Sequence, residues 1–338
     1  MTVVKAIFSN FTAFLMAILL TCVPYKGIKL PLIDTEKENC NLTLEMLSDT
    51  HIESAELFRQ GFLVCGLKNL DRAKCDIDAI LHTGDITNYA DDPSMAKYFE
   101  IISEKTDIPV ITAAGNHDMG HAGDRDKTTM TREEARDNYI KYRNEYMGID
   151  TETTYFSTEI KGYKFIVIND EVIDGGHWDA ISMSEEQLAF LDSELADGTK
   201  DGKPVFVLSH WPVYDTTGEQ TVWPDSGIPT TEVDPEDGYD IAPILEKYNN
   251  VYWISGHMHS GVKADVIDKE FAISSAEQVN GVTYLNLPTY GIINSFGLPW
   301  SCTGAQLEVY DDEVIFRPRN FITNNWYENA EYHFDIVK

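Results

Sequence analysis

Five short apolar segments, each followed directly by a turn and polar side chains, constrain this chain more than any other feature. They are too short for helices and mostly rich in β-branched or aromatic residues, so each predicts a β-strand. These strands are expected over 43–47, 79–81, 109–113, 204–208 and 251–254. Apolar residues at helical spacing lie between several of them, over 53–70, 93–103 and 184–195. Strands that alternate with helices indicate a layered α/β domain.

Other strands do not fit a purely parallel sheet. Residues 154–169 resemble a hairpin, and 281–287 and 305–317 add antiparallel material, so we expect mixed sheets. Two segments have the character of insertions: a highly charged, partly helical one at about 120–144 and a long loop at about 214–240. Long loops beside strand ends often shape substrate access, although they can also be solvated surface excursions.

The ends of the five expected strands carry side chains that bind metals or transfer protons. They are Asp49 and His51, Asp85, Asn116 and His117, His210, and His257 and His259. Ligands of open α/β sheets bind beyond the carboxyl ends of the strands, so these groups should meet at one edge. Gly84, Gly115 and Gly256 each stand directly before one of them, where a close backbone approach is needed.

The number and type of these donors predict a metal site. Leaving His117 aside, four histidines, two aspartates and one asparagine exceed what one tetrahedral zinc ion can use. They suit two cations that share a bridging carboxylate. Mixed nitrogen and oxygen donors favour Mn, Fe, Zn or Ni over Ca or Mg. Two dications beside two carboxylates leave an excess of about two positive charges, which suits a small anion.

In this order, the DxH, GD, GNHD, lone His and GHxH motifs from Asp49 to His259 resemble the calcineurin-like metallophosphoesterase family. The resemblance implies a four-layer α-β-β-α sandwich of two mixed sheets flanked by helices. It also implies a dinuclear site of two divalent or trivalent metal ions at the C-terminal ends of the strands.

The resemblance also assigns roles to single residues. The first metal would be held by Asp49, His51, Asp85 and His259. The second would share Asp85 and be completed by Asn116, His210 and His257. His117 would stand beside the leaving group, with Asp118 orienting it. The purple acid phosphatase branch is disfavoured, because Asn88 occupies the position of that branch's tyrosine ligand.

These roles imply hydrolysis of a small phosphate ester, by in-line attack of a metal-activated hydroxide with His117 as general acid. Phosphodiesters are favoured because DxH with GNHD resembles the class III cyclic-nucleotide phosphodiesterases. A phosphomonoesterase or nucleotidase on the same site is the alternative, and a non-catalytic metal-binding interaction module is a further one. The HExxH and HxHxDH motifs of metallopeptidases and lactamase-type hydrolases do not occur in the sequence.

The charge of the chain restricts its partners. Its 26 Lys and Arg against 56 Asp and Glu give a net charge of −30 at pH 7. Such a surface repels polyanions, so no extended nucleic-acid surface is expected. A small phosphate held by a local positive centre remains compatible with it.

The N-terminus predicts export. Residues 1–24 place Lys5 before an apolar block over 11–23, which is typical of a signal peptide or a membrane anchor. The run ending at Cys22 resembles a lipoprotein box, so a membrane tether is an alternative. We therefore expect an extracellular protein or one anchored on the outer face. A lead-in linker over 25–42 and one domain over 43–338 would follow.

The remaining cysteines and aromatic residues leave alternatives open. Cys40, Cys65, Cys75 and Cys302 could form disulfides or be buried free thiols. His82 is expected to be a packed, hydrogen-bonded histidine, and His177 and His333 surface residues. His121 could face the cleft or decorate the insertion. Trp211, Trp223 and Tyr290 could stack on a substrate but are more simply rim or core residues.

Overall fold

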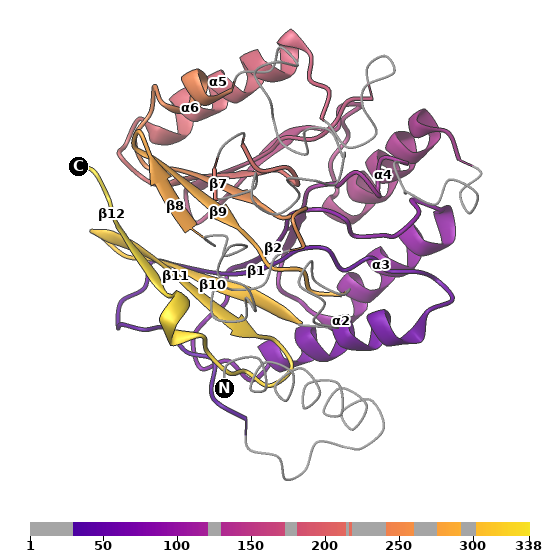
Figure 1. Cartoon of the computed structure of the whole chain (residues 1–338), viewed down its shortest axis with the longest axis horizontal. Helices are drawn as coiled ribbons and strands as arrows, with labels where there is room; N and C mark the ends of the chain where they lie inside the picture. The colour runs from indigo at the N-terminus through magenta and orange to yellow at the C-terminus, as the bar shows by residue number, and fades with distance from the viewer. Residues whose placement is uncertain are drawn as a thin grey trace, which may run out of the picture.

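Two six-stranded sheets and their flanking helices form the described part of the chain, as shown by a computed structural model (Figure 1). The described residues are 30–120, 130–172, 181–213, 216–217, 241–259, 276–291 and 302–338. The strands are β1 Leu42–Leu47, β2 Ala79–His82, β3 Val110–Thr112, β4 Phe156–Ile160, β5 Tyr163–Val167, β6 Val205–Leu208, β7 Val251–Ser255, β8 Ala276–Val279, β9 Val282–Asn286, β10 Thr303–Val309, β11 Glu313–Asn320 and β12 Tyr332–Asp335. The helices are α2 Leu57–Leu70, α3 Asp92–Lys105, α4 Arg132–Met147, α5 Glu185–Thr199, α6 Ala242–Leu245 and the 3-10 turn η5 Glu328–Ala330.

Both sheets are mixed, as the sequence predicts. The first has the order β12-β11-β10-β1-β2-β3, in which β1, β2 and β3 run parallel and the other three antiparallel. The second has the order β4-β5-β6-β7-β9-β8, with a parallel centre and one antiparallel strand at each edge. The predicted hairpin at 154–169 is β4–β5, which turns at Lys161 and Gly162.

The two sheets pack face to face, and helices cover both outer faces. One apolar cluster joins residues of both sheets, among them Leu44 and Leu81 from the first and Phe165 and Phe206 from the second. A second cluster joins the first sheet to α2, α3 and α4, and a third joins the second sheet to α5 and α6. Figure 1 shows the two groups of helices on opposite sides. This is the expected four-layer α-β-β-α sandwich.

The helix starts follow their capping residues. The expected helix over 53–70 begins only at Leu57, because the Glu56 side chain accepts a hydrogen bond from the backbone N–H of Phe58 and caps α2. Ser184 caps α5 as expected, accepting from the N–H of Gln187. The Gln187 side chain instead contacts Asn169 and Glu171, so the capping box is only half formed. Most of α4 lies in the charged insertion, and this helix has a complete capping box.

The described part of the expected linker is not a free linker. Residues 30–41 lie against the first sheet and α2, with Ile33 fully buried. The carbonyl of Asp34 accepts hydrogen bonds from Gln306 and Arg317, and that of Ile33 accepts from Lys74. The described part of the expected linker is therefore an extended segment whose backbone is bound to the domain by Lys74, Gln306 and Arg317.

The structure also bears on the cysteines and the N-terminus. Cys40, Cys65, Cys75 and Cys302 are free thiols, and burial raises the pKa of Cys65 to about 11. The segment 1–24, most of the insertion at 214–240, and His121, His177 and Trp223 lie outside the described residues. Within the described ranges, none of the helices has both the length and the apolar character required of a membrane span.

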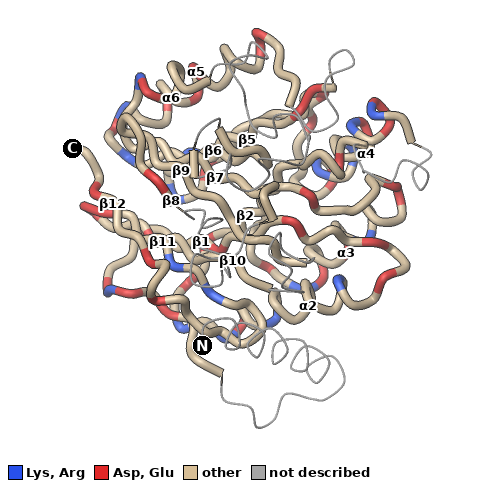
Figure 2. The backbone as a smooth tube through the Cα atoms, in the orientation of Figure 1, with Lys and Arg blue, Asp and Glu red and all other residues tan. Residues whose placement is uncertain are grey.

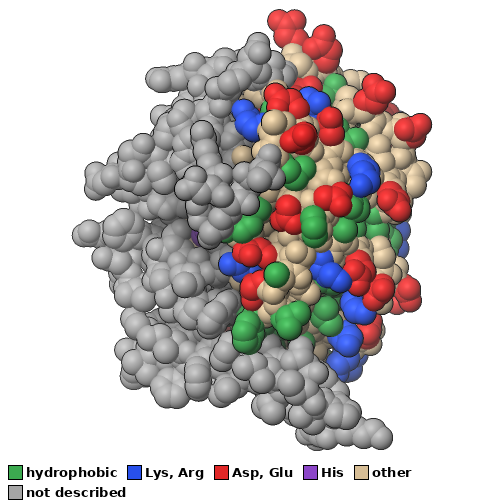
Figure 3. Space-filling model, turned by 90° about the vertical axis from the view of Figure 1, so that its right-hand side faces the viewer, with side chains coloured by type: hydrophobic (Ala, Val, Ile, Leu, Met, Phe, Trp, Pro, Cys, Tyr) green, Lys and Arg blue, Asp and Glu red, His purple; other side chains and the backbone are tan. Residues whose placement is uncertain are grey.

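Acidic side chains dominate the charge of the described surface, as the net charge requires. Figure 2 shows them along most elements, and Figure 3 shows them over much of the visible face with Lys and Arg interspersed.

Candidate metal centre

A first group of four side chains meets where β1, β2 and β7 end. Asp49, His51, Asp85 and His259 each offer one donor atom, and these atoms all lie within 4.8 Å of one another. His51 Nε2 lies 3.3 Å from His259 Nε2 and 3.5 Å from Asp85 Oδ2. Asp49 Oδ1 lies 3.3 Å from His259 Nε2. Nitrogen and oxygen donors thus converge from strands that are far apart in sequence.

A second group also meets at Asp85 and contains the remaining predicted ligands. His210 Nε2 lies 3.1 Å from Asn116 Oδ1, 3.1 Å from His257 Nδ1 and 3.4 Å from Asp85 Oδ2. The same Asp85 oxygen therefore faces a histidine of each group. All seven predicted ligands are brought together around this carboxylate.

Asp49 tests whether these residues fit a cation. Its side chain is fully buried, and neither carboxylate oxygen accepts a hydrogen bond from any described residue. A buried carboxylate without hydrogen bonds is strongly destabilising unless a positive charge lies beside it. Within the described residues, the ion-pair partners of Asp49 and Asp85 are histidines only. The donor set therefore fits metal ions.

The orientation of His210 also fits a metal ligand. Its Nδ1 lies 3.0 Å from the carbonyl oxygen of Thr83. A carbonyl only accepts, so Nδ1 carries the proton and Nε2 is left for the cluster. Metal-binding histidines usually donate their second N–H to such a partner.

The backbone at the site is strained. Five of the seven predicted ligands have left-handed φ angles, a conformation that costs roughly 1 kcal/mol or more for a non-glycine residue. They are Asp49 (57°), His51 (47°), Asp85 (51°), His257 (70°) and His259 (45°). Such strain persists only where the surrounding structure imposes it, and it is typical of functional sites.

Glycine makes this crowding possible at two positions. A Cβ at Gly115 would lie 2.1 Å from Asp85 Oδ1, and one at Gly256 would lie 2.8 Å from Asp49 Oδ2. Both contacts are too short for any side chain, so the expected close backbone approach is present.

The ionisation of the cluster follows from burial and its internal charges. Burial raises the pKa of Asp85, but the neighbouring histidines, His210 foremost, outweigh burial and hold this pKa well below its usual range. Burial lowers the pKa of His210, but Asp85 outweighs it and raises the pKa to about 9. Burial lowers the pKa of His51 and His257 well below the usual value. A cation that binds His210 must therefore displace a proton.

His117 lies at the partly exposed side of the cluster, with its ring perpendicular to that of His51 at a centroid distance of 4.6 Å. Its backbone N–H donates to Asp85 Oδ1 (3.0 Å), and its Nδ1 lies 2.9 Å from the carbonyl oxygen of Asn88. That carbonyl, which the sequence reasoning missed, orients the ring. Every residue has a backbone carbonyl, so no residue type in the sequence could have indicated this contact.

The expectation that Asp118 orients His117 was wrong. The Asp118 carboxylate accepts four hydrogen bonds, from the backbone N–H groups of Gly115, Ile86 and Thr87 and from the Thr87 hydroxyl. These bonds join the Asp85 loop to the Asn116 loop. Burial, reinforced by the charge of Asp85, raises the pKa of Asp118 to about 7. Asp118 is thus a structural residue that shapes the site.

The other polar and aromatic candidates lie where the simpler interpretation puts them. His82 is buried, with Nδ1 accepting from the N–H of Gly84 and Nε2 3.1 Å from the Thr50 hydroxyl. His333 is a surface residue between Glu313 and Glu331. Trp211 and Tyr290 are core residues that are at most 1% exposed.

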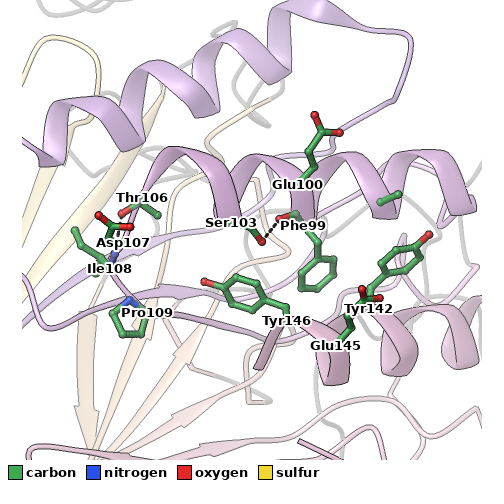
Figure 4. Close-up of a pocket in the computed structure, with 11 residues that line it drawn as sticks. Phe99, Glu100, Ser103, Thr106, Asp107, Ile108, Pro109, Tyr142, Glu145 and Tyr146 are labelled. Atoms are coloured by element: carbon green, nitrogen blue, oxygen red, sulfur yellow. Dashed lines mark hydrogen bonds between the residues drawn. The ribbon is translucent and has the colours of Figure 1, made fainter. Parts of the chain in front are cut away.

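A groove of about 530 Å³ lies between α3 and α4 (Figure 4). Phe99, Tyr142 and Tyr146 line it, and the figure shows the Ser103 hydroxyl donating to the Phe99 carbonyl. None of its lining residues is a predicted ligand, so it is separate from the candidate metal centre.

Comparison with known proteins shows the fold and the family. A dimetal phosphatase from Danio rerio superposes with a TM-score of 0.57 at 12% identity, covering 88% of this chain and 100% of that one. A purple acid phosphatase from yellow lupin (Lupinus luteus) seeds gives a TM-score of 0.56 at 14% identity, covering 87% of this chain and 53% of the lupin chain. Such low identities show a shared fold alone. No curated protein sequence matches the chain. Residues 46–261, more than half of the chain, match the calcineurin-like phosphoesterase family.

Proposed function

The chain belongs to the calcineurin-like phosphoesterase family and is a metal-dependent hydrolase of phosphate esters; within that activity, we propose that it acts on phosphodiesters with His117 as general acid. The observation that carries this proposal is the convergence of seven donors around Asp85 Oδ2, with His117 beside them.

Two groups of residues would hold the metal ions. The first is Asp49, His51, Asp85 and His259, and the second is Asp85, Asn116, His210 and His257. The chemistry that such cations supply is activation of water as a nucleophile and neutralisation of phosphate charge. The residues themselves hold these donors in a buried, strained and therefore preorganised arrangement.

His117 is placed to move a proton. Its Nδ1–H donates to the Asn88 carbonyl, so Nε2 faces the substrate. In the protonated ring Nε2 carries the proton that goes to the leaving oxygen, and the ring is left as neutral imidazole with Nδ1–H still on the carbonyl. Proton donation to a departing alkoxide contributes roughly 10²- to 10⁴-fold to the rate. The contribution matters most for leaving groups of high pKa, which cannot depart as anions.

The preference for diesters is supported by charge. Within the described residues, no Lys or Arg forms an ion pair with Asp49 or Asp85, so the cations supply the positive charge of the centre. Against two aspartates, two dications leave an excess of about two positive charges. Counting the attacking hydroxide reduces this excess to about one, which matches the single negative charge of a diester, whereas a monoester carries up to two.

The test is turnover of the purified, metal-loaded chain on bis-p-nitrophenyl phosphate and p-nitrophenyl phosphate, with and without a chelator. We expect metal-dependent turnover of both and a higher kcat/KM for the diester. A higher value for the monoester would favour the phosphomonoesterase alternative. Full metal content without turnover of either would instead indicate a non-catalytic module.

The role of His117 has its own test. Replacing His117 by Ala should leave the metal content unchanged and reduce the rate mostly on poor leaving groups. Equal losses on good and poor leaving groups would argue against His117 as the acid.

We also propose export, from the apolar segment within residues 1–24. Cell fractionation and N-terminal sequencing test it. An intact N-terminus on a chain that is found inside the cell would contradict it.

A further inference from the structure

The position of the His117 ring depends on one backbone carbonyl, that of Asn88. The His117 main chain is fixed independently, through the Asp85 carboxylate. Any displacement of the Asn88 carbonyl would therefore turn the ring without moving its backbone. The question is what holds Asn88 in place.

Asn88 is held by the segment that directly follows His51. Its Nδ2 donates to Glu53 Oε1 at 2.6 Å, and its backbone N–H donates to the Ile52 carbonyl at 3.3 Å. The contact to Glu53 is the shorter one and is charge-assisted, and such bonds are roughly twice as strong as neutral ones. Glu53 thus fixes the peptide whose carbonyl binds His117.

Arg59, on the first turn of α2, holds Glu53 in turn. Its Nη1 lies 3.2 Å from Glu53 Oε1 and donates to the His51 carbonyl at 2.8 Å. Its Nε pairs with Glu56 Oε2 at 3.0 Å. The network therefore connects a predicted metal-binding loop to the predicted general acid.

Stability alone does not account for this arrangement. The Glu53 and Arg59 side chains are 29% and 22% exposed, and ion pairs near the surface contribute little to stability. The network instead fixes the position of the Asn88 peptide. Glu53 contacts the Asn88 side chain, whereas Glu56 contacts Arg59.

We infer that Glu53 is a positioning residue, which acts through the Asn88 side chain to keep the His117 Nδ1–H on the Asn88 carbonyl and Nε2 toward the site, both in the neutral ring and in the protonated ring that donates from Nε2. The inference rests on the proposed function for its effect on rate. Its structural part concerns the His117 ring alone and holds whatever the substrate is.

The first experiment reads the ring directly. Long-range ¹⁵N–¹H correlation spectra of the full chain, as purified and after loading with zinc, report the His117 tautomer, assigned by its absence from a His117→Ala variant. We expect one Nδ1–H form in the wild type and in Glu53→Gln, which keeps an acceptor for Asn88. Glu53→Leu and Asn88→Ala should show a tautomer mixture.

Glu56→Ser is the matched control. It removes the other carboxylate from Arg59, while serine can still cap α2. We expect its His117 signals to match the wild type. Wild-type signals in Glu53→Leu, or the same change in Glu56→Ser, would overturn the inference. Asn88→Ala keeps the carbonyl, and it provides a second variant should Glu53→Leu fail to fold.

The second experiment reads the rate on two diesters. Bis-p-nitrophenyl phosphate has a leaving group that needs no proton, whereas a nucleoside cyclic phosphate releases an alkoxide. We expect Glu53→Leu to lose about 10- to 100-fold in kcat on the second and much less on the first, as for other changes that disturb the support of a site residue. Glu53→Gln should restore most of this loss.

Adding Asn88→Ala to Glu53→Leu should add little, because both break one contact. Additive losses, or equal losses on both diesters, would overturn the inference. An inactive wild type would instead overturn the proposed function, and the tautomer spectra would still decide the role of Glu53.

Discussion

Two clusters of buried charge lie on the first sheet, and they are built in opposite ways. On one face, opposite the inward-facing Leu44, Glu45 pairs with Arg319 at 2.9 Å and Glu308 with Arg317 at 2.7 Å. All four residues are buried. Each carboxylate of this arginine-paired cluster has its cation within the chain.

At the carboxyl edge of the same sheet, Asp49 and Asp85 are as deeply buried. Their ion-pair partners among the described residues are histidines, some of which burial keeps neutral. The comparison shows that the arginine-paired cluster, whose carboxylates are neutralised within the chain, supports the fold. The cluster of Asp49 and Asp85 instead leaves negative charge for an external cation.

The largest effect is expected from Asp85→Asn. Asp85 serves both groups of donors, so both metals and turnover should be lost, the latter by at least about 10³-fold, since changes outside the ligand set already cost 10- to 100-fold. The unfolding free energy of the metal-free protein should fall by less than in a variant that leaves an arginine unpaired, because His210, unlike an arginine, can lose its proton once Asp85 is replaced. Metal analysis, turnover and urea unfolding measure these three quantities. Retention of two metals would contradict the bridging position of Asp85.

Glu45→Leu should have the opposite profile. It leaves Arg319 buried and unpaired, which typically lowers the unfolding free energy by about 3–5 kcal/mol. The folded fraction should keep its metals and its kcat. Urea unfolding at pH 8 measures the loss under conditions where Glu45 is ionised, because burial raises its pKa to about 7 against the pull of Arg319.

A second substitution checks the mechanism of that loss. Replacing Arg319 by Met in the Glu45→Leu background removes the unpaired charge and should recover most of the stability. Failure to recover would mean that packing, including the contact of Arg319 with the Phe321 ring, dominates at this position.

Removing the metal with a chelator should have a smaller effect, a decrease in Tm that differs between variants of the two clusters. A ligand present at 100 times its Kd stabilises the folded state by about 2.7 kcal/mol, so removing the metal should lower the Tm of the wild type. Glu45→Leu should show the same decrease and Asp85→Asn almost none. Thermal unfolding with and without chelator measures it, and a decrease in Asp85→Asn equal to that of the wild type would contradict the assignment.

The sequence predicted the cluster of Asp49 and Asp85 but not the arginine-paired cluster. The ligands could be predicted because each directly follows an apolar strand, so the strand ends alone bring them to one edge. The pair of Glu45 and Arg319 joins residues 274 positions apart, and it depends on the register of β1, β10 and β11. Register over such separations is not visible in a single sequence.

The error over Asp118 has a related cause. Its neighbour His117 suggested a contact that follows from proximity in sequence. The carboxylate turns instead to the free N–H groups of the Asp85 loop, which lie 31 to 32 positions away. Which donors are unsatisfied is known only after both loops have folded.

The smallest predicted effect concerns His82, which shows that burial alone does not make a polar side chain depend on a cation. It is as buried as Asp85 but needs no cation, because Gly84 N–H donates to Nδ1 and Nε2–H meets the Thr50 hydroxyl. Burial lowers the pKa of His82 to about 3, below the usual 6.5. The unfolded chain therefore takes up a proton between pH 6.5 and 3 that the folded chain refuses. Stability from this group is complete above pH 6.5 and decreases as the pH falls, by at most about 1.4 kcal/mol per pH unit.

The measurement is the unfolding free energy of the wild type and of His82→Gln between pH 7 and pH 5. Glutamine does not titrate, so the difference between the two proteins should shrink as the pH falls. A difference that stays constant with pH would show that the folded state accepts the proton at His82. The loops that carry Asp49 and Asp85 would then tolerate a positive charge between them. His82 would no longer be an example of a buried group whose hydrogen bonds alone keep it neutral.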